Sequence, residues 1–182
     1  MWWESDGHLE VINNQLFIAG AEASVLAKKH GTPLYVYNGD RIIENLSAIQ
    51  NAFAKNNAKP RIHFAMKANS HLAILQLLFK KGAWIDAVSA NEVKLALKAG
   101  FPKEKILFTG TSVSNEELKS LIYLGVRINI DSFSQMQRMK ELGFKGEVSI
   151  RWNPSEGAGH HEHTITAGKF IKFGIPEDRI EE

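Results

Sequence analysis

The chain has 182 residues, of which 44% are hydrophobic and 23% charged, and its formal net charge is +2. This length suits one ordinary domain that buries its own core. The charge is too small and too evenly scattered for a nucleic-acid or membrane-binding protein, and the apolar runs are too short to span a bilayer. The chain has no cysteine, which excludes disulfides and thiolate chemistry and fits a reducing compartment. We therefore expect a cytoplasmic protein without a signal peptide.

The first segment, residues 1–37, is predicted to contain a β-hairpin, a helix and a strand. Alternating apolar residues on either side of Asn13-Asn14 predict the hairpin. Residues 21–30 follow as a short helix, which Gly31 ends. Residues 32–38, "TPLYVYN", are rich in β-branched and aromatic residues and predict a strand.

The second segment, residues 38–182, alternates strand-like and helical stretches. Apolar runs begin at residues 61, 83, 105, 126 and 148, which are 21 or 22 residues apart. Helical patterns lie between these runs, and three of them open with the capping pattern Ser-x-x-Glu/Gln at Ser89, Ser114 and Ser132. Such alternation, with runs that read as apolar on both faces, predicts a parallel sheet with crossover helices.

Two architectures fit this alternation, an open doubly wound sheet and a (β/α)₈ barrel. No G-x-G-x-x-G follows any of the runs, so nothing supports the dinucleotide-binding form of the open sheet. A barrel needs eight units, whereas five precede the end of the sequence. We therefore expect the front part of a larger protein, a truncated barrel.

Polar or charged side chains stand at or near the carboxyl ends of the five predicted strands. In parallel α/β folds this edge of the sheet carries the ligand site. The residues in question are Lys67, Asp86, Thr109, Asp131, Arg151 and Asn153.

Several of these residues have a plain structural interpretation. Asp131 and Ser132 together are interpreted as helix-capping residues, and Thr109 as a strand-end residue that bonds the next turn. Asp86 interrupts an apolar run and needs a cation or a ligand, because an unpaired buried carboxylate is costly. Lys67 follows the neighbouring strand and is a candidate partner for Asp86, either in a structural ion pair or in a functional one.

A lysine at this edge supports imine chemistry, because its neutral amine attacks aldehydes and ketones. With pyridoxal 5'-phosphate (PLP) the cofactor ring would serve as an electron sink. A lysine on a barrel strand also fits an aldolase, and the residues considered so far leave both possibilities open.

A long glycine-rich stretch, residues 151–175, follows the last predicted strand. Loops of this kind at a strand's carboxyl end are usually functional. His161, Glu162 and His163 resemble a ligand cluster, but no second cluster with regular spacing accompanies them, so no metal site is expected. The stretch is either a solvated loop or a loop that folds over the site.

From residue 9 to its end, the sequence resembles the diaminopimelate decarboxylase family. The resemblance rests on six motifs in register, which are "YVYN", "HFAMKANS", "GAWIDAVSANEV", "ILFTGTSVSNEEL", "INIDS" and "IRWNPSEGAGHHEHTITAGKFIKFGI". Members of this family are fold-type III PLP enzymes. The resemblance implies an alanine racemase-like (β/α)₈ barrel together with a β-domain, to which residues 1–37 would contribute.

The resemblance also implies roles for individual residues. Lys67 matches the lysine that holds PLP covalently, and Asp86 matches an aspartate near it. Arg151 matches an arginine facing the site, and Lys172 a position near a subunit interface. Two further loop residues near the site are matched by His161 and Thr166. Ala167 stands where many relatives have glycine, so this sequence departs from the family pattern there.

The function implied is PLP-dependent decarboxylation of meso-diaminopimelate to L-lysine by a homodimer. The alternatives are another fold-type III decarboxylase or racemase of basic amino acids, or a non-catalytic PLP-binding or assembly fragment. The family's His-x-Gly-Ser segment, its glycine-rich phosphate loop and its Cys-Glu-Ser segment do not occur within these residues. We therefore expect the 182-residue chain to be inactive or poorly active alone.

Overall fold

The computed structural model describes residues 7–156, 168 and 172–180. It has two compact units, Met1–Pro60 and Arg61–Glu182. The division expected from the sequence, at residues 37 and 38, falls inside the first unit and stays a prediction. Among the described residues, no helix is long and apolar enough to cross a membrane.

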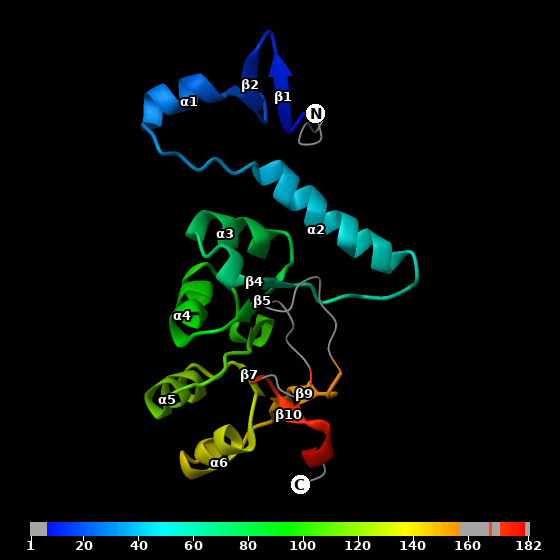
Figure 1. The fold of residues 1–182 in the computed structure, drawn as a ribbon, viewed down its shortest axis with the longest axis vertical. Helices are drawn as coiled ribbons and strands as arrows, with labels where there is room; N and C mark the ends of the chain where they lie inside the picture. Colours follow the sequence, from blue (N-terminus) through cyan, green and yellow to red (C-terminus); the bar gives the residue numbers. More distant parts are fainter. Residues whose placement is uncertain (1–6, 157–167, 169–171, 181–182) are drawn as a thin grey trace. The chain divides into compact units, whose positions relative to one another are not determined.

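The first unit begins with the predicted hairpin (Figure 1). Asn13 and Asn14 form its turn with φ of 53° and 62°, the left-handed region that a tight two-residue hairpin turn requires. A third strand, which the sequence analysis did not predict, pairs antiparallel with the second. The strands are β1 (Leu9–Ile12), β2 (Gln15–Ile18) and β3 (Ala21–Glu22).

Two helices complete this unit. Helix α1 (Ala23–His30) ends at Gly31, whose φ is 81°, as predicted. Helix α2 (Gly39–Ala54) begins after Asn38, whose side-chain oxygen accepts hydrogen bonds from the backbone N–H groups of residues 40 and 41. This cap satisfies amides that have no partner within the helix.

The strand predicted for residues 32–38 is wrong. The segment pairs with no strand in the described structure, and Tyr35 is 84% exposed. Strand propensity reflects packing on a paired, half-buried surface, and this segment has no such surface beside it within the unit.

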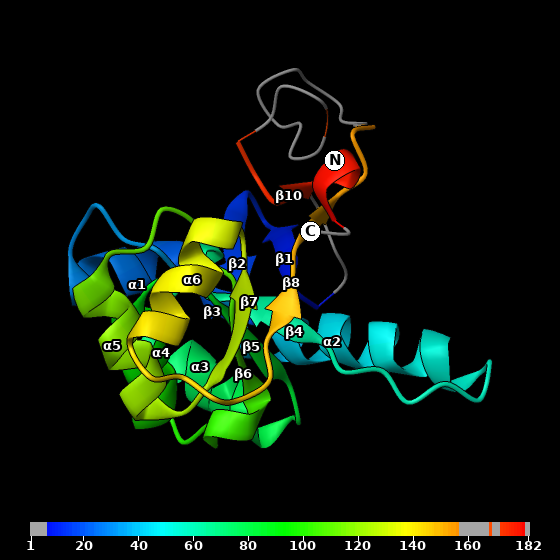
Figure 2. The same ribbon diagram turned by 90° about the horizontal axis from the view of Figure 1, so that it is seen from below.

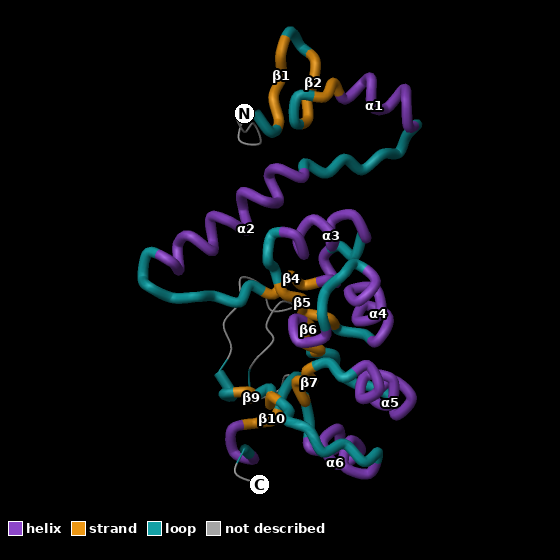
Figure 3. The backbone as a smooth tube through the Cα atoms, turned by 180° about the vertical axis from the view of Figure 1, so that it is seen from behind, coloured by secondary structure: helices purple, strands orange, loops and turns teal. Residues whose placement is uncertain are grey.

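The second unit is built on a parallel sheet of five strands in chain order (Figure 1). Its strands are β4 (His63–Ala65), β5 (Trp84–Ala87), β6 (Ile106–Phe108), β7 (Arg127–Ile130) and β8 (Ser149–Ile150). The crossover helices are α3 (Leu72–Lys80), α4 (Ala90–Lys98), α5 (Asn115–Leu124) and α6 (Phe133–Glu141). These helices lie along one side of the sheet, as Figures 2 and 3 also show.

The second unit also contains shorter elements, which connect or follow the strands and helices of the large sheet. A second, two-stranded parallel pair joins β9 (Trp152–Asn153) to β10 (Ile175–Pro176). Single 3₁₀ turns are η1 (Met66–Ala68), η2 (Lys103–Lys105) and η4 (Glu177–Arg179).

The two faces of the large sheet differ, so the expectation of strands apolar on both faces is wrong. On the helix side the side chains are apolar and at most 1% exposed, namely Ile85, Ile106, Phe108, Ile128 and Ile130. The alternate residues are half-buried or, at Arg127, exposed, and several are polar, because successive side chains of a strand point to opposite faces. The polar strand residues therefore share the face away from the helices.

The predicted capping serines are confirmed. The hydroxyls of Ser89, Ser114 and Ser132 each accept a hydrogen bond from the backbone N–H three residues later. The Glu117 carboxylate, however, accepts from the backbone N–H of Ala90 on the neighbouring helix at 2.7 Å, which ties α5 to the start of α4.

A backbone hydrogen bond, and then the Ser114 side chain, lowers the pKa of Glu116 below its usual value.

Substituting Ile128 by alanine should destabilise the chain by about 2–5 kcal/mol, because the side chain is fully buried between β7 and the helices. The matched substitution Ile150→Ala removes a side chain that is 49% exposed at the end of the sheet and should cost less than about 1.5 kcal/mol. Urea unfolding followed by circular dichroism measures both. Equal losses would contradict the one-sided core.

Candidate functional site

Lys67 lies in η1, directly after the carboxyl end of β4. Its side chain is exposed, whereas its neighbour Met66 is 1% exposed and packs in the core. The Lys67 side chain makes no hydrogen bond and no ion pair within the described residues. The Asn69 side-chain oxygen accepts from the His71 N–H at 2.9 Å, which turns the chain into α3. The amine is thus carried by an anchored turn and has no partner in the part of the chain that the structure describes.

Asp86 is half-buried on β5, in register with Ala65 of β4 and Leu107 of β6. Its Oδ1 accepts a hydrogen bond from the Thr109 hydroxyl at 2.5 Å. No ion pair between Lys67 and Asp86 exists in the described structure, so the expected direct pairing is not formed here. The interpretation of Thr109 as a residue bonding the next turn is wrong, because its hydroxyl bonds across the strands to Asp86.

Nearer the start of β4 and β5, three side chains form a contact stack in which the His63 and Trp84 rings are tilted by 43° to one another. The His63 and Trp84 rings lie 5.4 Å apart, and the guanidinium carbon of Arg61 is 4.7 Å from the Trp84 ring centre. His63 Nδ1 lies 3.1 Å from the backbone oxygen of Ile85. His63 and Trp84 are register partners and precede Ala65 and Asp86 by two residues, so they share the same face of the sheet. The sequence analysis missed this stack, although period-two spacing from Asp86 points to it.

A second cluster centres on the buried carboxylate of Asp131, which follows β7. Its Oδ1 lies 3.6 Å from a guanidinium nitrogen of Arg151 and accepts from the backbone N–H of Gly174 at 3.0 Å. The Ser132 hydroxyl caps α6, and the Asp131 backbone N–H donates to the Gln135 side-chain oxygen at 3.0 Å, so the two residues share the capping as expected, but the Asp131 carboxylate has other partners. The guanidinium of Arg151 also lies 4.5 Å from the ring centre of Phe173.

This cluster holds the return of the chain beside β9. The Ile175 N–H donates to the Arg151 carbonyl at 2.8 Å, which begins the pairing of β10 with β9. Gly174 has a φ of 78°, and a Cβ there would stand 2.8 Å from the same carbonyl oxygen. Only glycine fits this approach without rearrangement. Asp131 therefore fastens both Arg151 and the segment that returns to it.

The remaining predicted residues differ in how far they are buried and in what they contact. Lys172 is exposed, with its Nζ 5.3 Å from the Phe173 ring centre. Asn153 is buried and exchanges two hydrogen bonds of 3.0 Å with the backbone of Gly168. His161 and Thr166, like the His-His-Glu-His run, lie outside the described residues. In the part that the structure does describe, no group of histidine and carboxylate side chains is placed to hold a metal ion.

The residues around Asp86 and the cluster around Asp131 lie at the same edge of the sheet. Lys67, Asp86 and Thr109 follow or end strands β4 to β6, and Asp131 and Arg151 follow β7 and β8. Because all five strands are parallel, these carboxyl ends meet at the same edge. This is the edge at which parallel α/β proteins bind their ligands.

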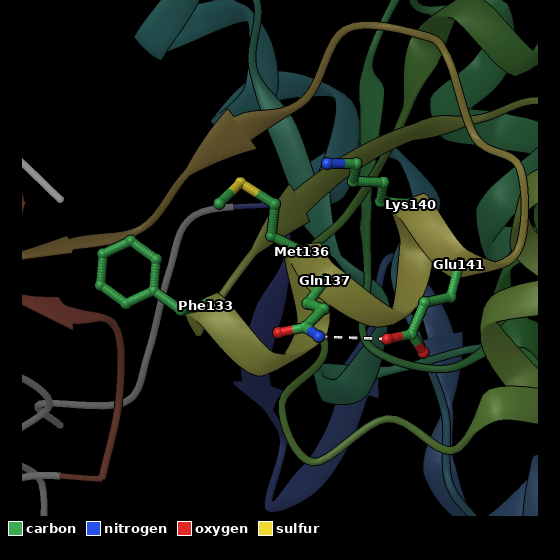
Figure 4. A pocket seen from close by; sticks show the side chains of 5 residues that line it. All are labelled: Phe133, Met136, Gln137, Lys140 and Glu141. Carbon is green, nitrogen blue, oxygen red and sulfur yellow. Dashed lines mark hydrogen bonds between the residues drawn. The ribbon is translucent and has the colours of Figure 1, made fainter.

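An open hollow of about 730 Å³ lies on α6 and contains none of the predicted site residues (Figure 4). It is lined by Phe133, Met136, Gln137, Lys140 and Glu141. The Gln137 amide donates to the Glu141 carboxylate at 3.1 Å.

The family model for the pyridoxal binding domain of pyridoxal-dependent decarboxylases matches residues 39–182. The chain belongs to this family.

Several relatives show which kind of decarboxylase the chain is similar to. The diaminopimelate decarboxylase of Methanothermobacter thermautotrophicus is 45% identical over 168 residues, which cover 92% of this chain and 39% of the relative. That of Bacillus subtilis is 36% identical over 174 residues, 93% of this chain and 38% of the relative. The crystal structure of diaminopimelate decarboxylase from M. jannaschii with L-lysine matches with a TM-score of 0.82 at 33% identity, covering 94% of this chain and 42% of that one.

These findings confirm two predictions, the resemblance to diaminopimelate decarboxylases and the fold class, the first part of an alanine racemase-like barrel. The chain spans about two fifths of the length of the relatives it matches.

Replacing Asp131 by alanine should lower the free energy of unfolding by about 2 kcal/mol, because Arg151 and the Gly174 N–H both lose their acceptor. The figure is below that for a fully buried pair because the Arg151 side chain is 30% exposed. Asp131→Asn keeps an oxygen for Gly174 and should lose about half as much. Urea unfolding measures both variants, and a wild-type midpoint for Asp131→Ala would exclude the anchoring role.

Proposed function

We propose that the complete gene product is a PLP-dependent decarboxylase that removes a carboxyl group from meso-diaminopimelate and releases L-lysine. The observation that carries the proposal is the exposed amine of Lys67, which has no partner among the described residues and stands two residues after the register partner of Asp86, at the carboxyl edge of a parallel sheet. The diaminopimelate decarboxylase relatives support the reaction, and the L-lysine held by the M. jannaschii enzyme supports a basic amino acid as the ligand.

The residues at this edge fit PLP in their chemistry. The cofactor is an aldehyde, and Lys67 offers an exposed primary amine that no described residue occupies. Asp86 offers a carboxylate of which only Oδ1 has a described partner. Bound PLP supplies an electron sink for the carbanion that the loss of carbon dioxide leaves behind.

The chain's own groups would bind and orient. The charge of Asp86 attracts a protonated amine at Lys67 and sets its direction. Arg151 is proposed to supply a fixed positive charge toward anionic groups of cofactor or substrate, because Asp131 and Phe173 hold its guanidinium. His161 and Thr166 are proposed as further residues near the ligand, and Lys172 as a residue at a subunit interface.

We also propose that the complete protein is a cytoplasmic homodimer that acts on a small amino acid and binds neither nucleic acid nor membrane. The low net charge and the absence of cysteine support the compartment. Size-exclusion chromatography with light scattering tests the dimer.

Borohydride reduction of the PLP-loaded gene product, followed by peptide mapping, should find the pyridoxyl group on Lys67. Lys67→Ala should abolish this label, because no amine remains at the end of β4. Lys94→Ala removes an exposed lysine on α4 and should keep the label, which makes it the matched control. A pyridoxyl group on any other lysine would refute the assignment.

Carbon dioxide release from diaminopimelate should exceed that from lysine, ornithine and arginine by roughly 100-fold or more in kcat/KM, because a site that pairs the substrate's polar groups rejects analogues that lack them. A preference for ornithine or arginine would point instead to another decarboxylase of this family. Racemisation without carbon dioxide release would exclude decarboxylation altogether.

A further inference from the structure

The partner of Asp86 is a hydroxyl on the next strand. Asp86 lies on β5 and Thr109 directly follows β6, and their side chains meet at 2.5 Å between Oδ1 and Oγ1. Since an ionised carboxylate can only accept, the hydroxyl donates. Hydrogen bonds to a charged acceptor are shorter and stronger than those between neutral groups. This contact therefore fixes one of the two carboxylate oxygens.

Thr109 is itself held tightly. Its backbone N–H donates to the Ala87 carbonyl at 2.8 Å, which continues the pairing of β5 with β6 by one residue. The next residue, Gly110, lies so close to β5 that a Cβ there would stand 2.6 Å from the Val88 carbonyl oxygen. Threonine is also stiff about its first side-chain torsion. The hydroxyl is thus a rigid donor, set by the sheet.

The other side of Asp86 is left open. No described residue donates to its Oδ2, and no described cation pairs with it. Its register partner on β4 is Ala65, which has only a methyl group to place beside it. Two residues further along the same strand end stands Lys67. The carboxylate is thus anchored on the β6 side, and no described residue holds it on the β4 side, which is the side of the strand that leads to the amine.

We propose that Thr109 is a positioning residue of the site, which acts through Asp86. By holding Oδ1 it would stop the carboxylate from rotating and keep Oδ2 available to the side-chain nitrogen of Lys67, the atom that would carry PLP. This inference rests on the proposed function, because it assumes that Lys67 carries the cofactor.

The test uses the complete gene product and four variants, T109V, T109S, D86N and the double variant D86N/T109V. Valine keeps the shape of threonine without the hydroxyl, and serine keeps the hydroxyl without the methyl group. The first readout is the rate at which PLP leaves each protein, followed by the visible absorption of the bound cofactor after dilution. The second is the fraction of Lys67 that borohydride labels at limiting PLP.

T109V should release PLP roughly tenfold faster than wild type and give a lower labelled fraction, since a hydrogen bond to a charged group is lost. T109S should restore wild-type release. D86N should release PLP faster as well, and adding T109V to it should change the rate less than twofold, because the hydroxyl then orients only a neutral amide and no longer a negative charge. Circular dichroism checks that every variant is folded.

Wild-type behaviour of T109V would overturn the inference while leaving the assignment of Lys67 intact. So would a T109S variant as impaired as T109V, because the methyl packing rather than the hydroxyl would then matter. A full additional effect of T109V in the D86N background would show that Thr109 does not act through Asp86. Absence of label on Lys67 in the wild-type protein would overturn both the proposed function and this inference.

Discussion

The burial of one face of the parallel sheet is the constraint on which the arrangement of the site depends. Isoleucine and phenylalanine side chains fill the space between the strands and helices α3 to α6, and they leave almost no exposed surface. A slip of one residue in any strand would turn these side chains to the other face and would be strongly unfavourable. The register is therefore fixed, and with it the face on which Asp86 and its neighbours stand.

Two carboxylates at the sheet edge are held in different ways. Asp131 is buried and is bound by a cation and a backbone amide, so both of its described partners come from the segments that it fastens. Asp86 is half-buried, and among the described residues a single hydroxyl binds it, at Oδ1. The first arrangement suits a structural anchor, because little of the group remains for a ligand. The second suits a group that has to meet a ligand.

The edge of the sheet also shows how a small hydrogen-bonded turn can place a reactive group. Met66 is buried and Asn69 bonds to the backbone ahead of α3, so the backbone of Lys67 and Ala68 between them is fixed, while the Lys67 side chain has no partner among the described residues. A lysine at this position has a fixed backbone, and its amine has no partner among the described residues. The same logic applies to Arg151, whose guanidinium is positioned by groups from another strand end and from the returning chain.

Sequence alone determined most of the helices and strands and their order. Period, capping serines and stop glycines are local, and they predicted the hairpin, the helices and the strand ends that carry Lys67, Asp86 and Arg151. Only the tertiary structure decided which side chains meet. Thr109 bonds to Asp86 from 23 residues away, and Gly174 bonds to Asp131 from 43 residues away. Such contacts depend on strand register and chain return, which residue types and spacing do not encode. The same reason explains why the strand predicted for residues 32–38 is wrong: the residue types favour a strand, but the described structure offers no strand to pair with it.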